Sequence, residues 1–380
     1  METLLIVFLL AVLALIIIYF YYDRYRKVKK GKDPQTYIEG LRALLEGKDE
    51  LAFARFRDAV SEDSSNIDAY IRIGNILRKY DKADKALQVH KDLTLRHGLE
   101  SVQKIAILDA VAEDYMKLKD FQAARNALVE AIKLDGSDRR LNKKLTKVLL
   151  KLEDWDAAFD IRQKLSKLSP EDKGDGELAI YKFFQGKRLF DNKKYHDARL
   201  VFKEAININA GCVPAYIWIG DSYVAENRLE DAVAVWNNMI KAVPDESVLV
   251  LERLEKALFE LGKFGAISDI CRDILSASTD NIDARLTLAE YHNKKGEYSL
   301  AVEHLRVAME NHPDSFRPVL NLARLYLITN DKEKLKTLLD SISLRRESIE
   351  MGFRCRICDY KSEKKIWLCP SCQAPDSFIR

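Results

Sequence analysis

The chain has 380 residues, a length that suits either two domains or one extended array of small units. Charged residues make up 32% of it but the net charge is only +3, which excludes a polycation of the nucleic-acid-binding kind. Glycine (15) and proline (8) are scarce, which argues against an all-β chain with many turns. Ala, Leu, Glu, Lys and Arg are abundant, as exposed helices require, so the composition predicts a mostly α-helical protein.

The first predicted element is an apolar helix at the amino terminus. The nineteen residues Leu4–Tyr22 include no charged side chain, and as a helix they would be about 28 Å long, enough to cross a hydrocarbon core. A cleaved signal peptide is disfavoured, because no basic residue precedes the run and no small-x-small site follows it. Tyrosines at the end of the run would anchor it at the interface, namely Tyr19, Tyr21, Tyr22 and Tyr25. We therefore expect an uncleaved transmembrane helix.

The stretch "DRYRKVKKGK" follows this helix and predicts its orientation. Six basic residues lie between positions 24 and 32, and none precedes the apolar run. By the positive-inside rule, the amino terminus would lie outside and the rest of the chain in the cytoplasm. We assign 1–32 to the anchor and its basic exit. In a reducing compartment, paired Cys-x-x-Cys motifs indicate a metal site rather than disulfides.

A period of 34 residues runs through the middle of the chain. Gly40 and Gly74 are 34 apart, as are Ala52 and Ala86, and in both units the glycine stands twelve residues before the alanine. A small residue on the first helix of a pair lets the second helix approach, and a large residue four after the alanine fills the groove toward the next unit. The pattern resembles the tetratricopeptide repeat. We predict an all-α superhelical solenoid over 33–349, with a groove that binds other proteins.

About nine units can be assigned, of which the fourth, seventh and ninth are degenerate. They are 33–66, 67–100, 105–138, 139–172, 179–212, 213–246, 247–280, 282–315 and 316–349. The insert at 169–177 is the expected break or bend in the array. Cys212 and Cys271 have no partner at ligand spacing and are expected to be small core residues. The six histidines are scattered, so ordinary surface or packing roles are favoured for them.

The last predicted element is a metal ribbon at 350–380. Cys355 and Cys358 form one Cys-x-x-Cys pair, Cys369 and Cys372 form a second, and ten residues separate the pairs. Each pair can form a tight turn, and two such turns complete a tetrahedral four-sulfur site. A tail this short cannot bury enough core to fold alone, and metal binding worth about 10–16 kcal/mol would offset the deficit. The pattern resembles rubredoxin. We expect one structural zinc ion, with iron as the second candidate.

No motif for catalysis was found. The sequence has no phosphate-binding glycine loop, no GxSxG elbow and no zinc-hydrolase motif. All four ribbon cysteines would serve as ligands, which leaves no coordination position for a reactive water. We therefore predict no enzymatic activity and assign no catalytic or cofactor-binding residue. Basic side chains of the ribbon alternate with acidic ones, so solvated surface is favoured over nucleic-acid binding there.

The order of the elements resembles the lipopolysaccharide assembly protein B family of the bacterial inner membrane. The sharpest part of the resemblance is "FRCRICDYKSEKKIWLCPSCQAP", with an aromatic residue two before the first Cys, Trp two before the third, and Cys-Pro-x-Cys. Asp359 stands where rubredoxin knuckles usually have glycine, and Asp tolerates the left-handed conformation better than most residues.

The resemblance implies a single-pass inner-membrane adaptor with a periplasmic amino terminus. It would help present the deacetylase of the lipid A pathway to a membrane AAA+ protease, and so control lipopolysaccharide synthesis. A general scaffold that gathers envelope-synthesis proteins is the alternative, followed by an electron carrier with iron in the ribbon. Assembly into a homo-oligomer is left open, and the sequence does not predict which groove residues contact a client.

Overall fold

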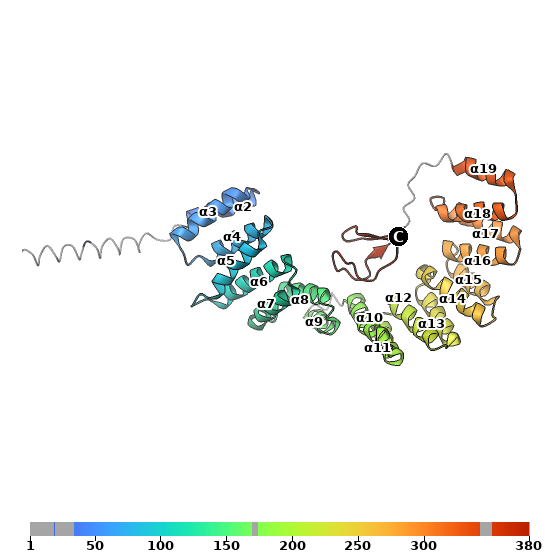
Figure 1. Cartoon of the computed structure of the whole chain (residues 1–380), viewed down its shortest axis with the longest axis horizontal. Helices are drawn as coiled ribbons and strands as arrows, with labels where there is room; N and C mark the ends of the chain where they lie inside the picture. Colours follow the sequence, from blue (N-terminus) through green and yellow to red (C-terminus); the bar gives the residue numbers. More distant parts are fainter. Residues whose placement is uncertain (1–18, 20–33, 169–173, 343–351, 380) are drawn as a thin grey trace, which may run out of the picture. The chain divides into compact units, whose positions relative to one another are not determined.

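Figure 1 shows a computed structural model of the chain, which describes residue 19 and the ranges 34–168, 174–342 and 352–379. The described residues form helices almost throughout, and short strands appear only after the last helix. The chain divides into two compact units, Met1–Leu152 and Glu153–Arg380. The boundary lies inside the predicted fourth repeat and precedes the insert at 169–177, part of which is outside the described residues.

The first unit is a stack of helix pairs. Each helix packs on the next one in the chain, so that α2 and α3, α4 and α5, and α6 and α7 make three pairs and α8 packs on α7. The helices are α2 (Gln35–Leu45), α3 (Asp49–Glu62), α4 (Ile67–Lys79), α5 (Ala83–Thr94), α6 (Ser101–Lys117), α7 (Phe121–Leu134) and α8 (Arg139–Lys151).

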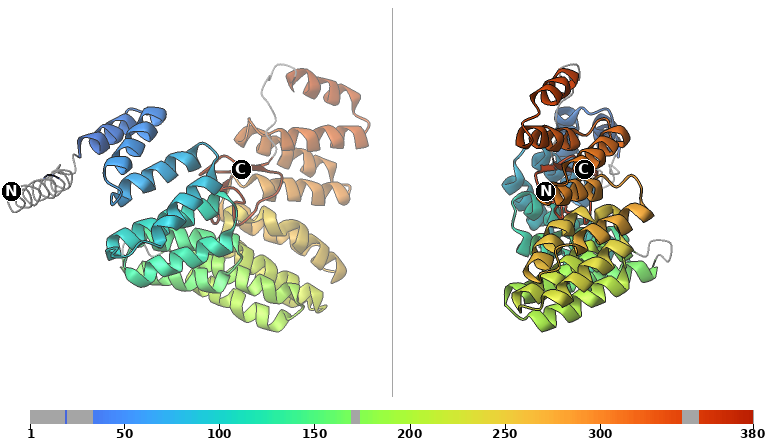
Figure 2. Two further views of the ribbon diagram at one scale, coloured as in Figure 1. Left: turned by 60° about the vertical axis from the view of Figure 1, so that its left-hand side comes forward. Right: turned by 90° about the vertical axis from the view of Figure 1, so that its right-hand side faces the viewer.

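The second unit continues in the same way, and Figure 2 shows the layered helices of each unit from two further sides. Its helices are α9 (Trp155–Leu168), α10 (Asp175–Asp191), α11 (Tyr195–Ile208), α12 (Val213–Ala225), α13 (Leu229–Ala242), the 3₁₀ turn η1 (Pro244–Glu246), α14 (Val248–Glu260), α15 (Ala266–Ala277), α16 (Ile282–Lys294), α17 (Tyr298–Asn311), α18 (Phe316–Ile328) and α19 (Lys332–Ile342). The chain ends in a small antiparallel sheet of β1 (Phe353–Cys355), β2 (Lys361–Ser362) and β3 (Phe378–Ile379), in the order β2-β1-β3.

In four repeats a glycine of the first helix admits a large side chain of the second, namely at Gly40, Gly74, Gly186 and Gly220. A Cβ atom added to Gly40 would lie 2.7 Å from the ring of Phe56, and one added to Gly220 would lie 2.1 Å from Nε1 of Trp236. Phe56 also belongs to a cluster that includes Ala69 of the next pair. The large residue therefore packs on its own repeat and on the following one, whereas the sequence predicted only the second contact.

The turn inside each helix pair contains one residue in the left-handed conformation. In the described chain nine such residues follow every second helix from α2 to α18, with φ between 55° and 76°. They are Gly47, Asp81, Lys119, Glu153, Lys193, Asn227, Gly262, Gly296 and Asn330. A left-handed residue ends a helix by letting backbone N–H groups reach its last carbonyls. Only three of the nine are glycine, so this regularity was not visible in the sequence.

The described helices are too short to cross a membrane. The longest, α6 and α10, have 17 residues each and carry charged side chains, whereas a spanning helix needs about 20 mostly apolar residues. Within the part of the chain that the structure describes, no helix is both long and apolar enough to span a bilayer. This finding contradicts the predicted placement as a single-pass inner-membrane protein, which is corrected here. Apart from Tyr19, the segment predicted to span lies outside the described residues.

Candidate metal centre

The small sheet places the two cysteine pairs in matching turns. Cys355 ends β1 and pairs with Phe378 of β3. In the first turn, the N–H of Asp359 donates to the carbonyl of Cys355 at 2.8 Å, and Asp359 is left-handed with φ 58°. In the second turn, the N–H of Gln373 donates to the carbonyl of Cys369 at 2.9 Å, and Gln373 has φ 59°. Asp359 thus adopts the backbone conformation that a rubredoxin knuckle requires.

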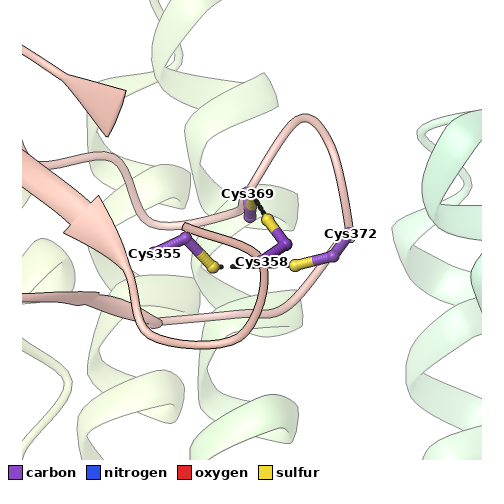
Figure 3. Close-up of side chains that lie close together, drawn as sticks. All are labelled: Cys355, Cys358, Cys369 and Cys372. Carbon is purple, nitrogen blue, oxygen red and sulfur yellow. Dashed lines mark hydrogen bonds between the residues drawn. The ribbon is translucent and has the colours of Figure 1, made fainter. Parts of the chain in front are cut away.

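These turns bring the four predicted ligands together, as Figure 3 shows. All four sulfur atoms lie within 4.8 Å of one another. The Sγ atoms of Cys355 and Cys372 are 3.6 Å apart, as are those of Cys358 and Cys369. Two sulfurs of a tetrahedral zinc site lie about 3.8 Å apart, since zinc–sulfur bonds are about 2.3 Å long, whereas a disulfide bond is about 2.05 Å long. The arrangement therefore fits a tetrahedral metal ion and not a pair of cystines.

The surroundings of the sulfurs favour thiolates on the first turn. Burial acts to raise the pKa of Cys355, but hydrogen bonds with the Ser377 side chain and with backbone N–H groups lower this pKa to about 6. The pKa of Cys358 is lowered mainly by the backbone N–H of Tyr360. Burial raises the pKa of Cys372 to about 12, with the neighbouring sulfurs adding to the effect. A bound metal ion would displace the thiol protons, because it binds the thiolate form.

The ribbon is attached to the second unit by its loop between the cysteine pairs. Trp367 packs against two apolar clusters of that unit, one around Ile219 and one around Leu254. Lys365 forms an ion pair with Glu246, and its Nζ lies 5.0 Å from the centre of the Trp367 ring. The Lys365 side chain is only 7% exposed, so this contact is part of the packed structure and not a solvated surface pair. No sequence signal had indicated the pairing.

The first helices of the last three pairs line a hollow of about 290 Å³. It combines an apolar floor with charged walls and is lined by Val248, Leu251, Glu252, Glu255, Asp283, Leu286, Thr287, Glu290, Arg317 and Asn321. Each charge of the lining already has a partner in this chain: Asp283 pairs with Arg317 at 2.6 Å, and Glu252 with Lys256 at 2.7 Å. Lys294 lies 2.6 Å from Glu255 and 3.8 Å from Glu290. The hollow belongs to the surface that the repeat pattern predicted for protein binding.

The remaining cysteines take no part in the centre. Cys212 and Cys271 are buried in the apolar clusters of the second unit. Burial raises the pKa of each thiol to about 12, which makes both unreactive.

Comparison with known proteins tests the predicted resemblance. No family model matches the chain. A protein of Haemophilus influenzae named Lipopolysaccharide assembly protein B is 24% identical over 95% of this chain and 94% of its own length. The protein of the same name from Escherichia coli K12 is 22% identical over 90% of this chain and 87% of its own length. The resemblance to lipopolysaccharide assembly protein B is confirmed.

Among solved structures, the chain is similar to YrrB, described as a TPR protein with an unusual peptide-binding site. The identity is 21%, the match covers 50% of this chain and 93% of YrrB, and the TM-score is 0.33. A second similar structure is that of MamA, with 15% identity, 55% of this chain and 96% of MamA covered, and a TM-score of 0.29.

Proposed function

We propose that this chain is a non-enzymatic adaptor that regulates lipopolysaccharide assembly. The observation that carries the proposal is the likeness, over 90–95% of the chain, to proteins named Lipopolysaccharide assembly protein B. The architecture supports the proposal, because stacked helix pairs form extended surfaces that bind other proteins. A centre that uses four sulfurs as ligands would have a structural role, since it keeps no position for a reactive water.

We propose further that the client is the deacetylase of the lipid A pathway, and that the adaptor promotes its degradation by an AAA+ protease. The resemblance to the lipopolysaccharide assembly protein B family motivates this choice of client. In this chain, the hollow on α14, α16 and α18 supplies a surface with both apolar and acidic groups. Such a surface suits a client segment that carries apolar and basic side chains.

The experiment measures the half-life of the deacetylase in cells depleted of this chain. Depletion should lengthen the half-life, and the wild-type chain should restore it. The double variant Glu255→Lys with Glu290→Lys, in the hollow, should fail to restore it. The control Glu310→Lys, an exposed position on the second helix α17, should behave as the wild type. An unchanged half-life after depletion would contradict the proposal. Co-purification of envelope-synthesis enzymes in that case would favour the general scaffold.

We propose that Cys355, Cys358, Cys369 and Cys372 hold one structural zinc ion. The sulfur separations support a tetrahedral ion, and zinc bound there would supply a fixed link between the two turns. Metal analysis of the purified full chain should give one zinc ion per chain. One iron ion per chain, with the visible absorption of an iron–thiolate site, would assign the centre to iron instead.

A further inference from the structure

We propose that the Ser377 hydroxyl is a positioning group of the metal centre, which donates a hydrogen bond to the Cys355 thiolate and thereby strengthens metal binding. This inference rests on the proposed metal site. No Cys-x-x-Cys spacing indicates Ser377, because the residue lies five positions after the last cysteine.

The sheet fixes Ser377 beside the sulfur. Its neighbour Phe378 pairs with Cys355 across β3 and β1, and the N–H of Arg356 donates to the Ser377 carbonyl at 2.9 Å. The Ser377 Oγ lies 3.2 Å from the Cys355 Sγ and 3.1 Å from the carbonyl oxygen of Ala374. The Ser377 residue is only 2% exposed. Water cannot replace the hydroxyl there.

The hydroxyl has one proton and two neighbouring acceptors. While Cys355 is a thiol, its S–H can donate to the Ser377 Oγ and the hydroxyl can donate to Ala374. A metal-bound Cys355 has no S–H, so the hydroxyl must be the donor in any hydrogen bond between the two groups. A charged sulfur is a stronger acceptor than a neutral carbonyl. Metal binding should therefore turn the hydroxyl from Ala374 towards Cys355.

The hydrogen bond matters at Cys355 because water does not reach this sulfur. A divalent cation with four thiolates carries a net charge of −2, which neighbouring donors must stabilise. Cys358 is exposed, so water can solvate its sulfur, whereas Cys355 is 1% exposed and depends on donors from the protein. Removing a donor of this kind typically weakens metal binding about 10–100-fold.

The test compares zinc affinity among full-length variants by competition with a chromogenic chelator. Ser377→Ala and Ser377→Val remove the hydroxyl, and Ser377→Thr keeps it at the same size as valine. The control is Ser362→Ala, since the Ser362 hydroxyl donates to the Lys364 carbonyl in the same ribbon. We expect about 10–100-fold weaker binding for Ala and Val, and wild-type affinity for Thr and the control.

A spectrum of the cobalt-loaded chains separates the hydrogen bond from packing. A hydrogen bond lowers the energy of the sulfur electrons, so its loss should move the sulfur-to-cobalt charge-transfer band to lower energy. We expect this shift in Ser377→Ala and Ser377→Val but not in Ser377→Thr. Equal zinc affinity in all variants, or Thr as weak as Val without a band shift, would overturn the inference alone. A wild-type chain that binds neither zinc nor iron would overturn the metal site as well.

Discussion

The repeat array and the carboxyl-terminal ribbon differ in what holds their chains in place. In the array, the alanine of the second helix has no exposed surface in seven repeats: Ala52, Ala86, Ala124, Ala158, Ala198, Ala232 and Ala301. In the ribbon, the buried apolar cluster consists of Cys355, Cys369 and Phe378. Apolar packing spread over many repeats tolerates local damage, because each repeat depends on its neighbours alone. A segment with so small a core depends on its cross-links.

Removal of one ligand should break the ribbon and spare the array, which is the largest expected effect. In Cys369→Ser, the ribbon should lose zinc binding worth about 10–16 kcal/mol and unfold. Far-UV circular dichroism should remain that of the wild type, because the described helices all precede the ribbon. Trp367 fluorescence should shift to longer wavelength as the indole leaves its apolar contacts.

Two comparisons control this result. A strong chelator added to the wild type should reproduce the fluorescence shift, and Cys271→Ala, which alters a buried thiol outside the ribbon, should keep one zinc ion per chain. A Cys369→Ser chain with a native Trp367 spectrum and no metal would show that packing alone holds the ribbon.

The array also contains a buried ionic cluster, whose loss should be the next largest effect. His90 and Asp114 are fully buried, and the His90 Nδ1 lies 2.5 Å from an Asp114 oxygen. Arg78 donates to the other oxygen of Asp114 at 2.6 Å. Asp114→Ala would remove the one carboxylate that pairs with the Arg78 guanidinium and with the His90 Nδ1 in this cluster, at a cost of about 3–5 kcal/mol. In the full chain, the amide hydrogens of α4–α6 should therefore exchange faster than in the wild type.

The matched control for this cluster is an exposed pair. Arg55 and Asp58 lie 3.7 Å apart, and their side chains are 43% and 58% exposed. Asp58→Ala should therefore change the free energy of opening, as measured by amide hydrogen exchange, by less than about 1 kcal/mol. Similar protection in both variants would mean that the buried cluster adds no stability.

Close packing of the helix pairs predicts a smaller effect. In Gly220→Ala the new Cβ would meet Trp236 at 2.1 Å, and such overpacking costs about 1–3 kcal/mol. Gly176→Ala is the control, because the nearest neighbour of the added Cβ would be 3.8 Å away and alanine is a better helix former than glycine. In urea unfolding of the full chains, the midpoint should be highest for Gly176→Ala, lower for the wild type and lowest for Gly220→Ala. The reverse order would contradict the packing found here.

Features that depend on residues close together in the sequence could be predicted. Contacts between residues far apart in the sequence could not. The glycine–alanine interval predicted the helix pairs, and two Cys-x-x-Cys motifs predicted the sulfurs that the structure brings together. The contacts of Ser377 with Cys355 and of Lys365 with Glu246 depend on how the chain folds back, over up to 119 residues. His90 was assigned an ordinary role because its partner Asp114 lies on another repeat. The membrane placement was inferred from the apolar run 4–22, the basic stretch that follows it and the family resemblance, and the described helices do not support it.

Substitutions of the left-handed turn residues should give the smallest effect. These residues allow repeats to be compared at one backbone position, which is glycine in some repeats and lysine in others. Lys193 has φ 60° and Gly262 has φ 69°. The left-handed conformation costs about 1–2 kcal/mol for a residue with a side chain, and this cost is absent for glycine.

Lys193→Gly should therefore stabilise the full chain by about 1 kcal/mol. Gly262→Ala should destabilise it by a similar amount, although the added Cβ would meet nothing within 4 Å. Since Lys193 is exposed and the Cβ added at Gly262 meets nothing within 4 Å, shifts of opposite sign in the urea midpoint would assign the effect to the backbone. Shifts of the same sign would show that these turns are not left-handed in solution.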